Sequence, residues 1–362
     1  MLHLLLASTM LLTGAQESKV STPNSLQEIC SLPTLDCEIS HQGVVVGMKG
    51  NTTGYETAIE EASKRFEAYF GRPAPKAAII LGNSVSDTQR RRIRQDHPVV
   101  LPWLTPKDKK ALIERSIRQQ LKQRMPNLTD AKLDAMVQQS LKASQKAKGV
   151  KEGADELHQG VVAHELGHLY FIETYWPNNL MDIGSPSAGH MAKEYGGPAA
   201  DWLDEIAAVL LETPFLKAQR RQGLSEIVRE ARLDDLWSLE EFFFMTHPAF
   251  EQAKKVIKAR QNTAEGRSKG GVVILSKEDV QSKGGRSPLN FYLQAQGFAD
   301  YLIEKTGDKK VFASIAESLS KGGSFISWLE TKGQVLGIPL TVAKLDIDFK
   351  QWITQTYKRK DR

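Results

Sequence analysis

The chain has 362 residues, of which 41% are hydrophobic and 25% are charged. This balance is typical of a globular protein with a sizeable core, and it excludes a mostly disordered chain. The formal net charge is +5, from 48 basic and 43 acidic residues. That excess is too small to indicate a nucleic-acid-binding protein, so no nucleic-acid partner is expected.

The first fifteen residues contain a short apolar run without Asp, Glu, Lys or Arg, which ends in Thr13-Gly14-Ala15. A helix needs about 20 apolar residues to cross a bilayer, so this run is too short for a stable membrane span. It favours a cleaved secretory signal peptide over 1–15, with a buried N-terminal helix as the alternative. We therefore expect an exported protein, in the periplasm or outside the cell, with no stable membrane span after signal removal.

The two cysteines of the chain, Cys30 and Cys37, lie just beyond this segment, with Pro33 between them. Cysteines are oxidised in pairs in exported proteins, so the spacing favours one local disulfide. No second Cys or His pair sits at the spacing of a zinc finger, and a cysteine metal site is therefore not expected.

Three apolar segments near the N-terminus have the length and composition of strands: 43–48, 76–82 and 98–104. Between the first two, apolar residues over 55–70 repeat at helical spacing. Pro102 lacks an N–H to donate and therefore favours an edge position for the third strand. The pattern predicts a small sheet packed against a helix, with an edge strand able to pair with an extended substrate.

The rest of the chain is predicted to be mostly helical. The segment 105–147 is polar and helical and has the composition of a surface insertion, whereas 262–288, with a strand-like stretch at 272–275, is predicted to be a loop or hairpin. Further helices are predicted over 155–176, 199–212, 215–260, 290–305, 309–320 and 324–332. The chain is thus predicted to be α+β, with a small mixed sheet and a helix N-terminal to a mostly helical half.

These elements suggest a division of the chain into five parts. They are a signal peptide (1–15), an N-terminal segment with the cysteine pair (16–42), an α/β subdomain with the polar helical insertion (43–154), a helical subdomain (155–345) and a basic C-terminal tail (346–362).

The sequence HELGH contains His164, Glu165 and His168 within the longest apolar helix. Residues four apart on a helix are only about 40° apart around its axis, so the two imidazoles face one point and can bind zinc. Glu165 lies beside them and is suited to act as a general base on a water molecule. A third histidine six residues later is excluded, because Thr174 occupies that position and Phe171 replaces the glycine expected with it.

A third ligand is expected, because catalytic zinc sites usually have three protein ligands and one open position. Glu205, which lies 37 residues after His168 on the next predicted helix, is the best candidate. Asp201 and Glu212 share roughly the same helix face and Asp204 is adjacent, so the pattern alone leaves the choice open.

HELGH together with WLDE at 202–205 resembles the gluzincin metallopeptidases, in which HExxH and a downstream glutamate bind zinc. In layout the chain is most similar to the bacterial peptidase MA-like branch of this group. The segment 55–82 resembles the N-terminal helix and strand of that branch, and 290–325 resembles its C-terminal helices. The resemblance covers most of 43–332, but only HELGH and WLDE are specific. It implies a zincin-like catalytic half.

The resemblance implies that His164, His168 and Glu205 bind one zinc ion per chain, with Glu165 as the catalytic base. It also implies a Tyr or His donor for the oxyanion, and Tyr292 is the candidate.

The sequence departs from the group at two points. The G-x-M-E-N strand of the aminopeptidase branch is absent, which argues against amino-terminal trimming. Val209 replaces the acidic residue that thermolysin-like members carry four positions after the glutamate ligand. The residues that orient the two histidines are therefore open, with Asp204 and Glu212 as candidates.

We therefore expect a secreted zinc-dependent peptidase that acts on peptide or protein substrates; the oligomeric state is not predicted. Two alternatives remain. One is a non-catalytic envelope or extracellular binding protein on a gluzincin scaffold, with the basic helices at 105–147 as its binding surface; a pure binding role would not need Glu165. The other is a zinc hydrolase that acts on a non-protein amide or ester.

Overall fold

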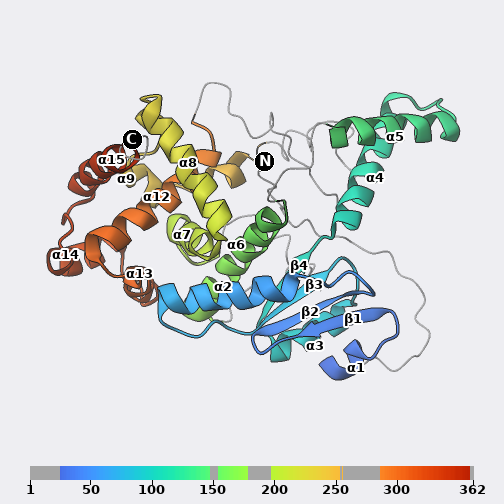
Figure 1. Cartoon of the computed structure of the whole chain (residues 1–362), viewed down its shortest axis with the longest axis horizontal. Helices are drawn as coiled ribbons and strands as arrows, with labels where there is room; N and C mark the ends of the chain where they lie inside the picture. The colour runs from blue at the N-terminus through green and yellow to red at the C-terminus, as the bar shows by residue number, and fades with distance from the viewer. Residues whose placement is uncertain (1–24, 147–153, 178–196, 253–254, 256–285, 359–362) are drawn as a thin grey trace.

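The computed structural model confirms the α+β class: a four-stranded mixed sheet near the N-terminus is followed by a mostly helical remainder (Figure 1). The residues that the structure describes are 25–146, 154–177, 197–252, 255 and 286–358. The expected signal peptide at 1–15 and the strand-like stretch at 272–275 lie outside them.

The sheet has the order β1-β2-β3-β4. Its strands are β1 (Leu35–Ile39), β2 (Gly43–Met48), β3 (Ala77–Leu81) and β4 (Val99–Trp103). β1 pairs with β2 in antiparallel orientation, while β2, β3 and β4 are parallel. The three strands predicted from the sequence are confirmed, and β4 lies at the edge as Pro102 indicated. β1 was not predicted.

Helices cover both faces of the sheet. They are α1 (Leu26–Cys30), α2 (Tyr55–Phe70) and α3 (Asp87–Asp96), together with α6 (Ala154–Tyr175) from the second half of the chain. Along β2, Val44 and Val46 pack with α1 and α3, whereas Val45 points to the opposite face and joins the core with α2 and α6. This alternation follows from the two-residue period of a strand. The sheet face that is covered by α2 and α6 forms one continuous core with the helical half of the chain.

The Cys30–Cys37 disulfide predicted from the sequence is present, with its sulfur atoms 2.05 Å apart. It joins the end of α1 to β1. Disulfides of this kind persist in oxidising compartments, so the bond points to such an environment.

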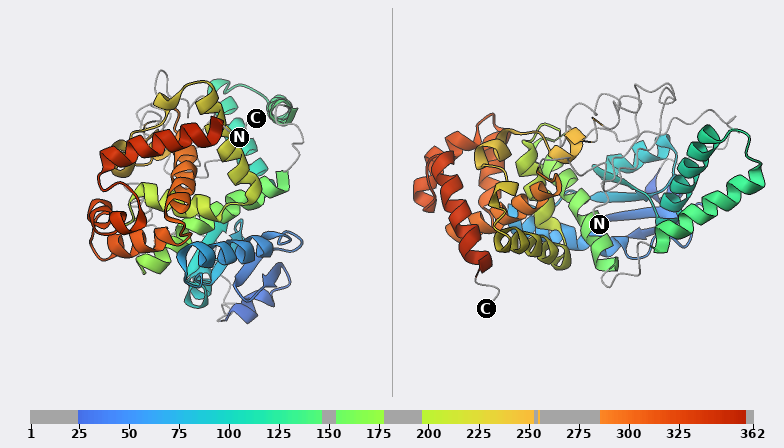
Figure 2. Two further views of the ribbon diagram at one scale, coloured as in Figure 1. Left: turned by 60° about the vertical axis from the view of Figure 1, so that its left-hand side comes forward. Right: turned by 90° about the horizontal axis from the view of Figure 1, so that it is seen from above.

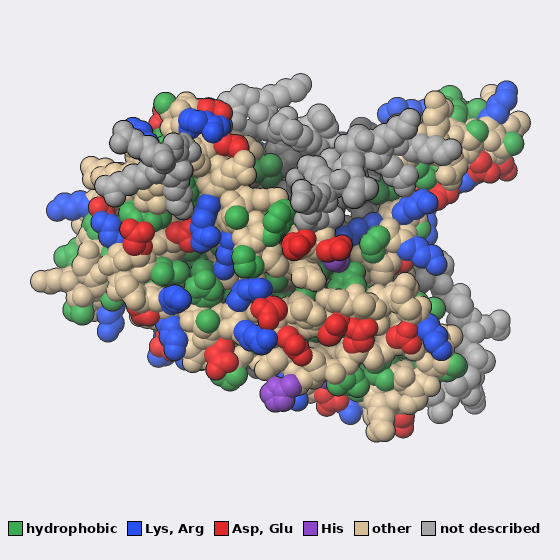
Figure 3. All heavy atoms as spheres, viewed as in Figure 1, with side chains coloured by type: hydrophobic (Ala, Val, Ile, Leu, Met, Phe, Trp, Pro, Cys, Tyr) green, Lys and Arg blue, Asp and Glu red, His purple; other side chains and the backbone are tan. Residues whose placement is uncertain are grey.

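The polar insertion forms two helices, α4 (Pro106–Arg124) and α5 (Asp130–Lys146). They project from the body of the protein as an arm (Figures 1 and 2). Leu133, Val137 and Leu141 of α5 form a small apolar cluster of their own with partly buried residues of α4. The rest of the arm is mostly exposed, and Figure 3 shows Lys and Arg side chains along it.

The helical half is arranged around α7 (Asp201–Leu211), in which every residue from Trp202 to Leu211 is buried. The surrounding elements are α6, α8 (Pro214–Arg229), η2 (Leu233–Asp235), α9 (Leu239–Phe244), α12 (Leu289–Thr306), α13 (Val311–Ser320), α14 (Phe325–Leu336) and α15 (Val342–Lys358). α15 was not predicted. None of the described helices combines the length and the apolar character needed to cross a membrane.

Candidate metal centre

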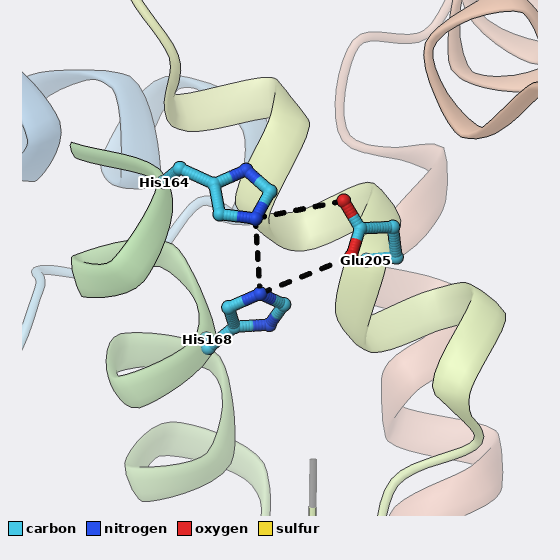
Figure 4. A group of neighbouring side chains, drawn as sticks. All are labelled: His164, His168 and Glu205. Carbon is cyan, nitrogen blue, oxygen red and sulfur yellow. Dashed lines mark hydrogen bonds and ion pairs between the residues drawn. The ribbon is translucent and has the colours of Figure 1, made fainter. Parts of the chain in front are cut away.

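The two histidines of HELGH lie one turn apart on α6, with their rings on the same side of the helix (Figure 4). The Nε2 atoms of His164 and His168 are 3.2 Å apart. Their side chains are only 9% and 14% exposed, respectively. The helical spacing predicted from the sequence therefore brings both imidazoles to one nearly buried point.

Glu205 reaches the same point from α7 (Figure 4) and is completely buried. Its Oε1 atom lies 3.6 Å from Nε2 of His164, and its Oε2 atom lies 3.9 Å from Nε2 of His168. One ligand atom from each of these three residues lies within 4.8 Å of the other two, so the group can hold a metal ion. Of the carboxylates that the sequence left open as a third ligand, Glu205 is the one that belongs to this group.

Gly167 allows the two helices to approach this closely. A Cβ atom at this position would lie 2.6 Å from the Cα of Ala208 and 3.1 Å from the carbonyl oxygen of Ala207, both backbone atoms of α7. Real Cβ atoms do not approach a backbone so closely, and any larger residue would push α6 away from α7. The glycine inside HELGH therefore sets the distance between the histidines and Glu205.

Each histidine is oriented by a buried carboxylate on its other ring nitrogen. Nδ1 of His164 lies 2.8 Å from Oε1 of Glu212, and Nδ1 of His168 lies 2.9 Å from Oδ2 of Asp204. Carboxylates in this position hold metal-binding imidazoles in place and fix their tautomer. Both partners that the sequence left as candidates are therefore used, one for each histidine.

This arrangement fits a metal ion. With a metal ion bound, each carboxylate would accept a hydrogen bond from Nδ1–H, so that the neutral imidazoles of His164 and His168 could direct their Nε2 lone pairs to the ion beside Glu205. Two nitrogens bound to one tetrahedral zinc ion at about 2.0–2.1 Å lie about 3.3 Å apart, and the observed Nε2 separation is 3.2 Å. The donor types, their burial and their spacing are thus suited to a metal ion.

Arg220 of α8 supports the Glu212 carboxylate. Its Nε donates to Oε2 of Glu212 at 2.7 Å, and a terminal nitrogen donates to Oε1. Both side chains are buried, and the guanidinium also lies 5.0 Å from the centre of the Tyr292 ring. Burial alone would raise the pKa of Glu212, but Arg220 lowers it, so the carboxylate stays ionised and holds His164.

The negative charge around the histidines favours a cation at their centre. Asp204, Glu205 and Glu212 are all completely buried. Burial would lower the pKa of His168, but the Asp204 carboxylate raises it to about 10. The pKa of Glu205, which burial would raise, is instead lowered by the neighbouring histidines. The site therefore stabilises positive charge where the three ligand atoms converge.

The two residues predicted to take part in catalysis lie next to this group. Glu165 is partly exposed on α6, and its charge acts on both His168 and Tyr292. Tyr292 of α12 is buried, and its ring centre lies 5.9 Å from that of His164. Burial raises the pKa of Tyr292 well above its ordinary value, so its hydroxyl stays protonated and can donate a hydrogen bond.

Sequence reasoning missed two residues that line this site, Arg220 and His247. Both are buried and polar, and His247 lies 3.4 Å from Glu205 through its Nε2 atom. Neither belongs to a spaced motif, and only the rarity of buried Arg and His could have drawn attention to them.

The fold and the site together define an α+β protein with a buried His/His/Glu group that can hold a metal ion. Comparison of the chain with protein-family models, with curated proteins and with solved structures found no match. The arrangement of side chains around α6 and α7 therefore carries the functional argument.

Proposed function

We propose that this chain is a zinc-dependent peptidase of the gluzincin type. The observation that carries the proposal is the buried convergence of His164, His168 and Glu205, with Glu165 adjacent in the same helix turn. A buried carboxylate between two oriented imidazoles is costly without a cation, and a binding role alone gives no reason for Glu165.

Zinc bound here would act as a Lewis acid on the attacking water and on the scissile carbonyl. Glu165 accepts a proton from the attacking water, whose oxygen forms the new bond to the carbonyl carbon. The same carboxyl group then delivers the proton to the amide nitrogen as the C–N bond breaks. Its partial exposure suits this exchange, because a water molecule can reach the carboxylate from solvent.

Tyr292 is suited to stabilise the tetrahedral oxyanion. Its protonated hydroxyl belongs to a ring that packs against both His164 and Arg220. A donor fixed in advance loses little orientational freedom when charge develops on the oxygen. The Arg220 guanidinium packs against the same ring and helps to hold it in place.

The edge strand β4 is proposed to pair with an extended peptide. β4 lies at one edge of the sheet and packs beside α6, which carries the histidines. Backbone pairing at a sheet edge holds a peptide in an extended form without requiring a particular sequence. The cleaved bond would then be presented close to Glu165.

Export is part of the same proposal. The Cys30–Cys37 disulfide supports an oxidising location, and the apolar run at 1–15 supports a signal peptide. A peptidase of this kind would work in the periplasm or outside the cell.

The test is metal content together with cleavage of unfolded casein, measured for the wild type, Glu205→Ala and Glu165→Gln. We expect about one zinc per wild-type chain, because the site offers one set of three ligands. Glu205→Ala should lose the zinc, whereas Glu165→Gln should retain it and lose activity by about 10²–10⁴-fold. Removal of zinc by a chelator should abolish cleavage, and added zinc should restore it.

Glu240→Gln, an exposed change in α9, is the matched control and should behave as the wild type. A zinc-loaded wild type that cleaves esters or non-protein amides but no peptide would contradict the peptidase assignment. A wild type that neither retains nor takes up zinc would contradict the metal centre itself and favour a binding protein.

A further inference from the structure

His247 is a completely buried histidine that neither the HELGH motif nor the WLDE motif includes. It lies between α9 and a following helical turn, and its Nε2 atom is 3.4 Å from Oε2 of Glu205. The site therefore contains three imidazoles around one carboxylate, of which two form the group that can hold the metal. The role of the third depends on which of its ring nitrogens carries the proton.

A backbone hydrogen bond determines which ring nitrogen of His247 carries the proton. The N–H of Ala249 donates to Nδ1 of His247 at 3.3 Å, so Nδ1 is an acceptor and Nε2 carries the hydrogen of the neutral ring. A protonated Nε2 has no lone pair for a metal ion, so His247 can donate to Glu205 but cannot serve as a fourth ligand. His247 thus has the opposite tautomer to His164 and His168, whose carboxylate partners hold the proton on Nδ1.

The ring of His247 is held from several sides. Its own backbone N–H donates to Oδ2 of Asp201 at 2.7 Å, which ties the segment to the first turn of α7. The rings of Phe291 and Tyr292 from α12 pack edge to face against the imidazole, with ring centres 4.6 and 5.0 Å away. His247 therefore has a fixed direction before any ligand arrives.

We infer that His247 is a positioning residue that donates a hydrogen bond from Nε2 to Oε2 of Glu205 and thereby fixes the rotation of the metal-binding carboxylate. With Oε2 held on this side, Oε1 faces Nε2 of His164 at 3.6 Å. The inference rests on the metal centre of the proposed function but not on peptide hydrolysis. It also gives the segment around His247, which is distant in sequence from α6 and α7, a direct part in metal affinity.

The test measures affinity for Co²⁺, through the visible absorption of the bound ion and competition with a chelator, in the full chain. His247→Leu removes the donor, and we expect 10–100-fold weaker binding, the usual loss when a group that orients a metal ligand is removed. His247→Gln places an amide nitrogen the same number of bonds from Cα as Nε2, and it should keep the affinity within about threefold and retain the wild-type spectrum.

Phe291→Leu is the control for packing, because it alters the contact with the same ring without removing a donor. Thermal unfolding of the metal-free proteins separates a loss of fold from a loss of affinity. Unchanged affinity in His247→Leu overturns the inference, and so does an equal loss in the Leu and Gln variants. If the wild type binds Co²⁺ and responds to these changes but cleaves no peptide, the peptidase proposal fails while the role of His247 stands. A wild type without metal affinity overturns both.

Discussion

Two pairs of packed helices in this protein use charged residues in opposite ways. α4 and α5 meet through a small apolar cluster, and their ion pair between Arg118 and Asp134 is 35% and 56% exposed. α6 and α7 meet around polar groups, and the ion pair that supports them, between Arg220 and Glu212, is 6% and 0% exposed. Arginine and carboxylate side chains therefore pair at the solvent-exposed surface in α4 and α5 but in the protein interior beside α6 and α7.

The difference shows where a charged residue carries function. In the arm the charges can exchange partners with water, so each ion pair contributes little. Around α7 every carboxylate must keep its partner, because an unpaired buried charge is strongly destabilising. A buried network of this kind holds the histidine rings in fixed directions, and that is what a metal site requires.

The largest predicted effect comes from breaking the buried ion pair. Arg220→Met leaves Glu212 buried without its guanidinium, and we expect a loss of about 3–5 kcal/mol in the free energy of unfolding. Urea denaturation monitored by circular dichroism measures this loss. Arg118→Met breaks the exposed pair of the arm and should cost less than about 1 kcal/mol. Equal losses in the two variants would contradict the contrast between the helix pairs.

A second prediction concerns the distance between α6 and α7. Gly167→Ala places a methyl group against the backbone of Ala208, and overpacking of this kind costs about 1–3 kcal/mol. It should also weaken metal binding, because it moves both histidines away from Glu205. Chelator competition and urea denaturation measure the two effects.

The matched control is Gly297→Ala in α12. There the new Cβ would lie 2.9 Å from the Cδ1 atom of Leu224, the end of a flexible side chain that can turn aside. Alanine also favours a helix by up to about 1 kcal/mol over glycine. We therefore expect little or no loss at this position, and wild-type metal affinity in Gly167→Ala would refute the spacing role.

The smallest effect concerns His158, which is on α6 and whose ring packs against Trp103 at the end of β4. Burial lowers the pKa of His158 from its ordinary value of 6.5. As the pH falls through 6.5, the unfolded chain therefore takes up the proton first, and the free energy of unfolding decreases.

His158→Phe keeps an aromatic ring against Trp103 but cannot titrate. Urea denaturation at several pH values between about 5 and 7.5 should show a smaller decrease in stability for this variant than for the wild type. An identical pH dependence in the two proteins would mean that His158 does not contribute to it.

Much of the fold could be predicted from the sequence wherever burial leaves a periodic pattern. β2, β3 and α2 were predicted within one residue of their observed bounds, because β2 and β3 are short continuous apolar runs and the buried residues of α2 repeat at helical spacing. α3 was missed because Ile93 is its only buried hydrophobic residue. In α15 the buried residues Leu345, Phe349, Trp352 and Ile353 are spaced as on one face of a helix, although the basic residues of this segment favour a tail.

Only the part of the site that depends on helical spacing could be predicted from the sequence. This spacing brings His164 and His168 together and points to the helix that carries Glu205. The direction of Glu212 could not be predicted, because it lies at the end of α7 with an extended backbone. His247 comes from a connecting segment. Its approach to Glu205 depends on how α9 and α12 pack around α7, and this packing cannot be predicted from a local sequence pattern.

The order of these residues along the chain also has a consequence for synthesis. All three groups that can hold the metal are made by residue 205, whereas Arg220, His247 and Tyr292 follow on later elements. A growing chain thus presents both histidines and the carboxylate before the residues that orient and cover them exist. Any ion captured early meets loosely held ligands, and the finished geometry is reached only when α12 has been added.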